Sequence, residues 1–196
     1  MKLILASASA SRRRVLEAAH VPFEVIPASI DEDAVKDQLL ANTPLADIAM
    51  KLAEAKAADV TAKHRDALVI GADQTLLFEG ALISKCPDVA AARALLLRLR
   101  GKPHSLVSAL VLMRGGEILW RHESRVHLTM RHFSDAFLDW YLAEEGEGLL
   151  AGVGCYRLEG PGSQLFASVE GDYFSTLGLP LLPLLAELRR QSVIAT

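Results

Sequence analysis

Short apolar runs alternate with amphipathic segments along this chain. Residues 3–5, 68–72 and 106–113 are bounded apolar runs, which predict buried strands. Residues 45–57 and 91–99 carry their apolar positions at helical spacing, which predicts helices with one buried face. Strands that alternate with helices are typical of an α/β fold. We expect one domain with a waist over residues 1–196, because no linker or repeat interrupts the pattern.

Turn and cap residues lie between the predicted strands and helices. Glu79-Gly80 separates two short apolar runs and predicts a tight hairpin, while Asp88 and Ser134 are expected N-caps of helices. Asn42-Thr43-Pro44 predicts a helix start, with proline at the first helical position. A proline-started apolar helix is expected over residues 177–190.

The opening stretch of residues 2–16 combines a strand, a small-residue turn and a helix that begins with three arginines. Ser7 and Ser9 offer hydroxyls, and a helix N-terminus presents free N–H groups and a positive dipole end to an anion. Arg12 and Arg13 add donors whose fork matches phosphate oxygens. We interpret the stretch as a polyphosphate cradle, with a capped surface helix as the equally weighted alternative.

Asp73 ends the second buried run, where open α/β folds keep catalytic groups. An aspartate there could coordinate magnesium or accept a proton from water, or could simply form a turn. Lys56 falls on the stripe of a helix that should be buried, so it must snorkel, form a pair or bind phosphate. The acidic corner at residues 31–33 favours a helix cap over a magnesium site by about two to one.

Composition narrows the function classes. The chain has 196 residues, is 51% hydrophobic and has a net charge of −3, which argues against general nucleic-acid binding. No apolar run approaches the roughly 20 residues of a membrane helix, and the weak signal-like start is followed by arginines. Cys86 and Cys155 are far apart in sequence and indicate neither a zinc site nor a disulfide scaffold. We therefore expect a cytoplasmic protein.

With these residues in hand, the chain resembles the Maf family of nucleoside triphosphate pyrophosphatases along nearly its whole length. Six motifs match in the right order, and the last of them matches almost letter for letter. They lie at residues 5–13, 52–57, 71–74, 84–86, 151–156 and 170–181. Ala10 and Cys86 stand where the family usually has proline.

The resemblance implies an elongated mixed β-sheet flanked by helices, with two lobes around a central cleft. It implies hydrolysis of a nucleoside triphosphate to a monophosphate and pyrophosphate with a divalent cation, Mg²⁺ or Mn²⁺. Asp73 would be the proton acceptor, with Lys56 and Lys85 as the other catalytic groups. Glu32 and Asp73 would hold the metal, with Glu32 as a candidate for positioning the lysines instead. The oligomeric state is left open, with a homodimer as one alternative.

Three positions separate the substrate branches of the family. This chain has Ser11, Gln74 and Glu159 there, and the last two match the branch similar to 7-methyl-GTP pyrophosphatases. Ser11 lacks the aromatic ring on which a methylated purine would stack. We expect a house-cleaning enzyme for modified or non-canonical triphosphates. The alternative is a nucleotide-binding regulator of septum formation that has no significant turnover.

Overall fold

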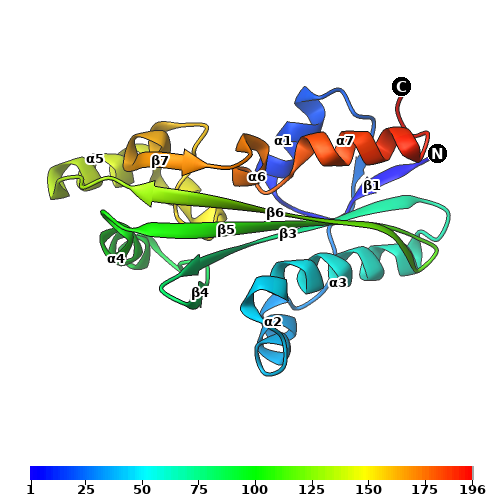
Figure 1. Cartoon of the computed structure of the whole chain (residues 1–196), viewed down its shortest axis with the longest axis horizontal. Helices are drawn as coiled ribbons and strands as arrows, with labels where there is room; N and C mark the ends of the chain where they lie inside the picture. Colours follow the sequence, from blue (N-terminus) through cyan, green and yellow to red (C-terminus); the bar gives the residue numbers. More distant parts are fainter. Residues whose placement is uncertain (196) are drawn as a thin grey trace. The chain divides into compact units, whose positions relative to one another are not determined.

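The computed structural model describes residues 1–195, and no helix in that range is long and apolar enough to cross a membrane. Seven strands form one sheet in the order β2-β1-β3-β5-β6-β7, with β4 paired to β3 (Figure 1). The pairs β1–β2 and β1–β3 are parallel, whereas β3–β4 and β6–β7 are antiparallel. The predicted mixed α/β fold is therefore confirmed.

The chain divides into two compact units, and three long strands pass through both. The first unit holds residues 1–74, residues 107–124 and the segment that begins at Asp172, and the second holds residues 75–106 and 125–171. The shared strands are β3 (Leu68–Phe78), β5 (Pro103–Arg114) and β6 (Glu117–Met130).

The first unit is built from short strands and five α-helices. One face of its strands packs on α1 and α7 through a cluster that includes Leu5, Leu16, Ile70 and Leu184. Because side chains alternate along a strand, Ile4, Val69 and Gly71 point to the other face. Its elements are β1 (Leu3–Leu5), α1 (Ala10–Ala18), β2 (Glu24–Val25), α2 (Glu32–Leu40), the 3₁₀ turn Leu45–Asp47, α3 (Ile48–Lys63), α6 (Tyr173–Thr176) and α7 (Leu181–Arg190).

The second unit has its own core around Phe78, Leu96, Val126 and Tyr141. The hairpin predicted at Glu79-Gly80 is confirmed, because Phe78 pairs with Ala81. Its elements are β4 (Ala81–Ile83), α4 (Val89–Leu99), α5 (Asp135–Glu145), the 3₁₀ turns Gly146–Ala151 and Pro161–Leu165, and β7 (Phe166–Glu170).

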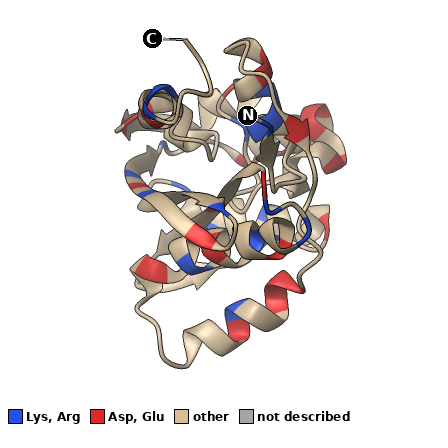
Figure 2. Cartoon of the chain, turned by 90° about the vertical axis from the view of Figure 1, so that its right-hand side faces the viewer, with Lys and Arg blue, Asp and Glu red and all other residues tan. Residues whose placement is uncertain are grey.

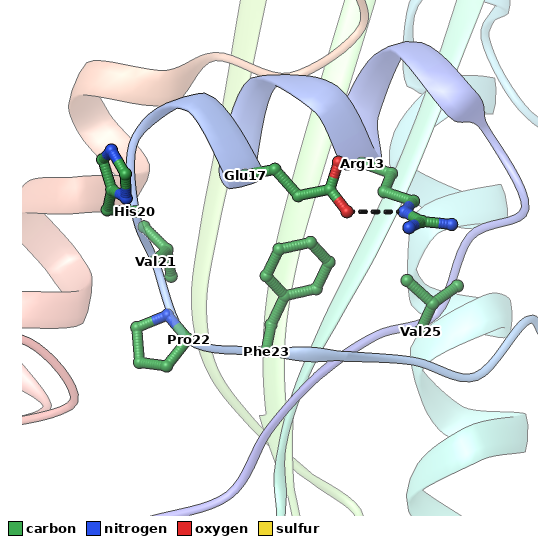
Figure 3. A pocket seen from close by; sticks show the side chains of 7 residues that line it. All are labelled: Arg13, Glu17, His20, Val21, Pro22, Phe23 and Val25. Carbon is green, nitrogen blue, oxygen red and sulfur yellow. Dashed lines mark hydrogen bonds and ion pairs between the residues drawn. The ribbon is translucent and has the colours of Figure 1, made fainter.

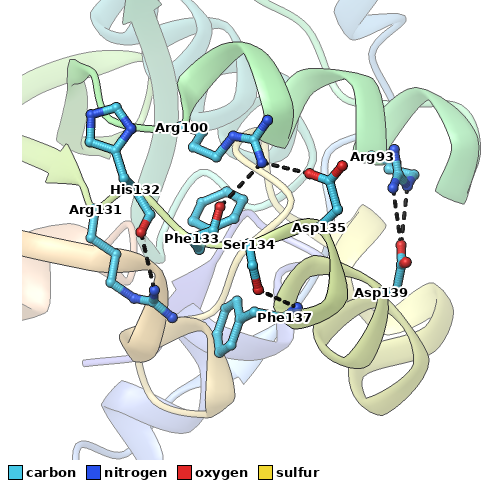
Figure 4. A network of polar contacts seen from close by, with 9 residues as sticks. All are labelled: Arg93, Arg100, Arg131, His132, Phe133, Ser134, Asp135, Phe137 and Asp139. Atoms are coloured by element: carbon cyan, nitrogen blue, oxygen red, sulfur yellow. Dashed lines mark hydrogen bonds and ion pairs between the residues drawn. The ribbon is translucent and has the colours of Figure 1, made fainter.

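Polar contacts tie α5 to α4 within the second unit (Figure 4). Arg93 pairs with Asp139 at 3.1 Å, and Arg100 pairs with Asp135 at 2.6 Å. Ser134 accepts from the N–H of Phe137, which confirms the predicted N-cap. These exposed ion pairs contribute little individually to stability, so the apolar contacts of the core dominate here.

The two cysteines, although distant in sequence, meet in the second unit. The side chain and the backbone of Cys86 both act on the pKa of the Cys155 thiol, so the two residues lie close together. Burial raises the pKa of Cys155 to about 12, so it stays a thiol at neutral pH. Both cysteines are free.

Two predicted helix starts are wrong. The chain forms a 3₁₀ turn after Pro44, and α3 begins only at Ile48, with no side-chain hydrogen bond from its N-cap Asp47. The apolar segment expected to be helical from residue 177 begins its helix at Leu181. Gly178 adopts φ +81°, a left-handed conformation that cannot belong to a right-handed helix.

Candidate functional site

The register of the parallel strands places the opening turn beside the middle of β3. Leu5 pairs with Ile70, and the N–H of Ala6 donates to Ile70 O at 2.8 Å. Pairing of β3 with β1 ends there, but β3 continues through Asp73 and Gln74 to Phe78, so the prediction that the strand ends at Asp73 is wrong. Because β1 and β3 run in one direction, the turn that leads into α1 lies beside the part of β3 that carries Asp73.

A close contact between α3 and β3 sets the position of the buried lysine. A Cβ atom at Gly71 would lie 2.1 Å from Ala53 O and 2.8 Å from Ala57 Cβ. Asp73 lies two residues further along the strand and so points to the same face as Gly71. Lys56 is on the buried stripe of α3 and meets Asp73 there.

Lys56 is held between two carboxylates. Its Nζ lies 2.7 Å from Asp73 Oδ1 and 2.7 Å from Glu32 Oε2, in the first turn of α2. Lys56 and Asp73 are buried, at 5% and 6% exposure, whereas the Glu32 side chain is 55% exposed. The lysine is therefore paired, which rules out the simple snorkelling interpretation.

The acidic corner serves two purposes in the structure. Asp31 is the N-cap of α2 and accepts from the N–H of Ala34 at 3.0 Å, which confirms the cap that the sequence favoured. Its neighbour Glu32 reaches Lys56 instead. Lys and Arg residues stand among Asp and Glu along the ribbon, α2 included (Figure 2).

Burial raises the pKa of Asp73, while the positive charges of Lys56 and Arg12 act in the opposite direction. Glu32 adds to the upward shift through repulsion. The net effect is that the pKa of the Asp73 carboxyl is raised above its ordinary value. A carboxylate with a raised pKa is a stronger proton acceptor than an ordinary one, as general-base catalysis requires.

Arg12 is buried and ties three segments together. Its Nε donates to Gly178 O at 2.9 Å, and its Nη1 donates to Ser7 Oγ at 2.9 Å and to Ala72 O at 3.0 Å. Burial lowers the pKa of Arg12, and the charges of Asp73 and Glu32 raise it. A guanidinium remains protonated at neutral pH, so Arg12 brings a fixed positive charge to the strand edge.

The two serines of the opening turn shape its backbone. Ser9 is the N-cap of α1, and its Oγ lies 3.4 Å from the N–H of Arg12. Ser7 Oγ accepts from the N–H of Ser9 at 3.3 Å and from Arg12 Nη1. The hydroxyl proton of Ser7 is not used in these bonds.

Arg13 lies apart from Arg12, although the two are adjacent in sequence. Its Nε pairs with Glu17 Oε1 at 2.7 Å on the exposed side of α1. Both side chains line a hollow of about 630 Å³ together with His20, Phe23 and Val25 (Figure 3). Neighbouring residues of a helix point about 100° apart, so one phosphate cradle does not collect both arginines without rearrangement.

Gln74 projects from the face of β3 opposite to Asp73. Its Nε2 lies 2.9 Å from Ser108 Oγ on β5 and 2.9 Å from Ser175 O in α6. Because residues 71–74 extend past β1, a ligand at this edge of the strand could contact side chains of both faces.

Of the remaining candidates, Ser11 is half-buried, and Lys85 and Glu159 are exposed. Ser11 is in the first turn of α1, where its Oγ lies 3.4 Å from Arg14 Nη2. Lys85 and Glu159 are both in the second unit, on the segments that follow β4 and the 3₁₀ turn Gly146–Ala151. Their predicted roles stay predictions.

The two carboxylates that flank Lys56 are ligands of the kind that a hard divalent cation prefers. Two carboxylate groups, from Glu32 and Asp73, converge on one positive charge. Mg²⁺ is commonly bound by one or two carboxylates together with waters and substrate phosphates. Within residues 1–195, the His, Cys, Asp and Glu side chains form no group of three or more able to hold a metal ion. Substrate oxygens would have to complete the coordination.

Sequence reasoning missed the serines that hold Gln74 and the difference between the two arginines. Ser108 lies within an apolar run and carries no local signal of function. The arginines did carry a signal, since helical geometry separates adjacent side chains. The contact of Glu32 with Lys56 joins two helices and has no signature in either segment.

The chain matches a known protein family and several proteins along nearly its whole length. The Maf-like protein family matches residues 2–191. A "Nucleoside triphosphate pyrophosphatase" of Granulibacter bethesdensis is 53% identical over 99% of both chains. A "7-methyl-GTP pyrophosphatase" of Brucella abortus is 48% identical over 99% of this chain and 98% of that protein, and one of Rhizobium meliloti is 50% identical over 98% and 97%.

A solved structure of a "Nucleoside-triphosphatase / dITP/XTP pyrophosphatase" from Mycobacterium abscessus covers 100% of this chain and 98% of its own, at 16% identity and a TM-score of 0.38. That likeness is too distant to bear on the fold or the site. The sequence matches are full-length and strong, so the resemblance seen in the motifs is confirmed: the chain belongs to the Maf-like protein family.

Proposed function

We propose that the protein is a nucleoside triphosphate pyrophosphatase that cleaves between the α- and β-phosphates and releases a monophosphate and pyrophosphate. The observation that carries this proposal is the buried Asp73, paired with Lys56 at 2.7 Å and placed at the strand edge that Arg12 also reaches. The names of relatives near 50% identity support the same reaction. Modified or non-canonical nucleotides, 7-methyl-GTP among them, are the proposed substrates, and the cytoplasm is the proposed location.

Asp73 is the proposed general base. Its bond to Lys56 uses Oδ1, so we assign Oδ2 to the attacking water, whose proton it would accept as oxygen approaches phosphorus. Its buried position also suits this role, because burial raises the pKa of the carboxyl.

Positive charge stabilises the triphosphate and the departing pyrophosphate. Arg12 uses Nε and Nη1 to hold the protein backbone, which leaves Nη2 for a phosphate oxygen. Ser7 would donate its hydroxyl proton, and Lys56 supplies a buried ammonium group. We assign Ser9, Arg13 and Lys85 to the phosphate chain as well, and for Arg13 this requires that its side chain leave Glu17. Fixed donors of this kind act on charge that develops during the reaction.

A divalent cation, Mg²⁺ or Mn²⁺, is the proposed cofactor, with Glu32 and Asp73 as its protein ligands. When bound, it neutralises phosphate charge and orients the substrate. Lys56 Nζ lies 2.7 Å from each of these carboxylates, and its ammonium group would also be available to the phosphates of a bound substrate.

A pyrophosphate-release assay tests the function directly. With Mg²⁺ and a panel of canonical and methylated triphosphates, we expect one pyrophosphate for each monophosphate formed. Release of orthophosphate in place of pyrophosphate would contradict the position of cleavage. Binding without turnover would favour the alternative of a nucleotide-binding regulator.

Lys56→Ala is expected to raise KM for the triphosphate about tenfold, because a buried charge-assisted contact to phosphate is lost. Lys51→Ala is the matched control, since Lys51 is an exposed lysine on the same helix and pairs with Glu54. Steady-state kinetics of both variants give the comparison. A KM for Lys56→Ala equal to that of the control would mean that Lys56 is purely structural.

The acid side of the pH profile should move in opposite directions in two variants. Lys56 lowers the pKa of Asp73 and Glu32 raises it. Because the carboxylate is the active form, kcat/KM falls as pH drops below that pKa. Lys56→Ala should therefore shift the acid limb to higher pH, and Glu32→Gln should shift it to lower pH. Identical limbs in the two variants would exclude Asp73 as the titrating base.

A further inference from the structure

Three hydrogen-bond acceptors surround the amide nitrogen of Gln74. Nε2 lies 2.9 Å from Ser108 Oγ, 2.9 Å from Ser175 O and 3.3 Å from Thr176 O. Two of the three are backbone carbonyl oxygens, which only accept hydrogen bonds. If the amide were turned by 180°, Oε1 would face these oxygens without a proton between them. The surroundings therefore fix which end of the amide is nitrogen, a choice that otherwise stays ambiguous for glutamine.

Ser108 reinforces this choice. It is buried, at 1% exposure, and its Oγ donates to Ser175 O at 2.7 Å. A hydroxyl has one proton, so toward Gln74 the same oxygen can only accept. Ser108 thus presents a lone pair to Gln74, in the same sense as the two carbonyl groups.

The carbonyl groups are themselves held in place. Asp172 is the N-cap of α6, and its Oδ2 accepts from the N–H of Ser175 at 2.7 Å and from Ser175 Oγ at 2.7 Å. Ser175 Oγ also lies 2.8 Å from Ser124 Oγ on β6. This polar network spans β5, β6 and α6, and it is rigid because its members are fixed by backbone as well as side-chain bonds.

We propose that Ser108 is a positioning residue that makes Gln74 a hydrogen-bond acceptor toward the nucleobase. Both protons of Nε2 are directed at protein oxygens, so Oε1 is the group left for a ligand. The base edge that meets Gln74 must then carry N–H groups. A guanine-type edge has adjacent N1–H and 2-amino donors, and we assign the 2-amino group to Oε1 of Gln74. This inference deepens the proposed function and rests on it.

The test compares Ser108→Ala with Ser105→Ala, a change on the same strand at a half-buried serine that contacts His127 instead. The substrates are GTP and ITP, which differ only by the 2-amino group. We expect the unmodified protein to prefer GTP about tenfold in kcat/KM, the size of one hydrogen bond. In Ser108→Ala the ratio should fall, through a higher KM for GTP with kcat nearly unchanged, because one of the three acceptors that direct Nε2 is lost while the two carbonyl oxygens remain. Ser105→Ala should keep the original ratio.

A second measurement follows the amide itself. The Nε2 protons of Gln74, assigned by their disappearance in Gln74→Leu, should give two separated NMR signals that exchange slowly with water. Ser108→Ala should shift them and speed the exchange. Unchanged signals would overturn the positioning role, and changed signals with an unchanged GTP/ITP ratio would overturn the role in base selection.

These readouts separate the inference from the proposed function. If the unmodified protein hydrolyses no triphosphate, the function fails, and dissociation constants for GTP and ITP then replace KM in the same comparison. Equal affinity of the unmodified protein for the two nucleotides would overturn the inference on its own.

Discussion

Asp73→Asn is expected to reduce kcat/KM for a nucleoside triphosphate by about a thousandfold, with little change in the fold. The substitution keeps the size of the side chain, and the asparagine Oδ1 can still accept from Lys56 Nζ, which lies 2.7 Å away in the unmodified protein. It removes the negative charge and the capacity to take a proton from water. General-base groups typically contribute 10²- to 10⁴-fold to the rate.

The comparison needs a control for charge and one for folding. Asp33→Asn removes a carboxylate from the exposed side of α2, and we expect it to leave turnover within about twofold, as surface changes do. Thermal unfolding of both variants reports any loss of structure. Asp73→Asn that folds normally and turns over at the original rate would assign the base to another residue.

The sequence motifs identified the residues of this site better than they predicted which of those residues contact one another. Lys56 was expected on a buried helix stripe, which the structure confirms, and Asp73 was expected at the end of a buried strand, whereas it lies within β3. The two side chains meet at 2.7 Å. Each expectation followed from local periodicity, which is the part of a fold that sequence encodes most directly. Their contact depends on Gly71, whose missing side chain lets α3 approach β3. No periodicity marks such an approach.

Adjacent polar residues in a motif are where the sequence interpretation was weakest. Arg12 and Arg13 were assigned to one cradle, yet the first is buried against Gly178 and the second pairs with Glu17 at the surface. Asp73 and Gln74 likewise leave β3 on opposite faces. A motif records which residues are near one another in the chain, whereas secondary structure decides which of them share a face.

Gly71→Ala is expected to destabilise the protein by about 3 kcal/mol or more. The added Cβ would lie 2.1 Å from Ala53 O, a backbone atom inside a helix that cannot move alone. Overpacking of a core typically costs 1 to 3 kcal/mol even when flexible side chains can yield. The smaller gain that alanine brings by restricting the unfolded chain does not offset such a clash. Urea unfolding measures the difference.

Two further variants identify the backbone as the cause. Gly148→Ala is the control, because its Cβ would meet nothing closer than Arg157 Nη1 at 3.9 Å. In the double variant Gly71→Ala with Ala57→Gly, the contact at 2.8 Å with Ala57 Cβ is gone but the one with Ala53 O remains. Glycine also costs about 1 kcal/mol within a helix. The double variant should therefore be no more stable than Gly71→Ala, and recovery of the original stability would show that the helix backbone is not what Gly71 avoids.

Gly71→Ala should also lower activity in the fraction that stays folded. Any retreat of α3 from β3 carries Lys56 away from Asp73, which removes the nearest positive charge that lowers the pKa of the carboxyl. The acid limb of kcat/KM should then move to higher pH, as in Lys56→Ala. A folded Gly71→Ala protein with an unshifted acid limb would mean that α3 distorts locally at Ala53 while Lys56 stays beside Asp73. The role of Gly71 would then be limited to packing.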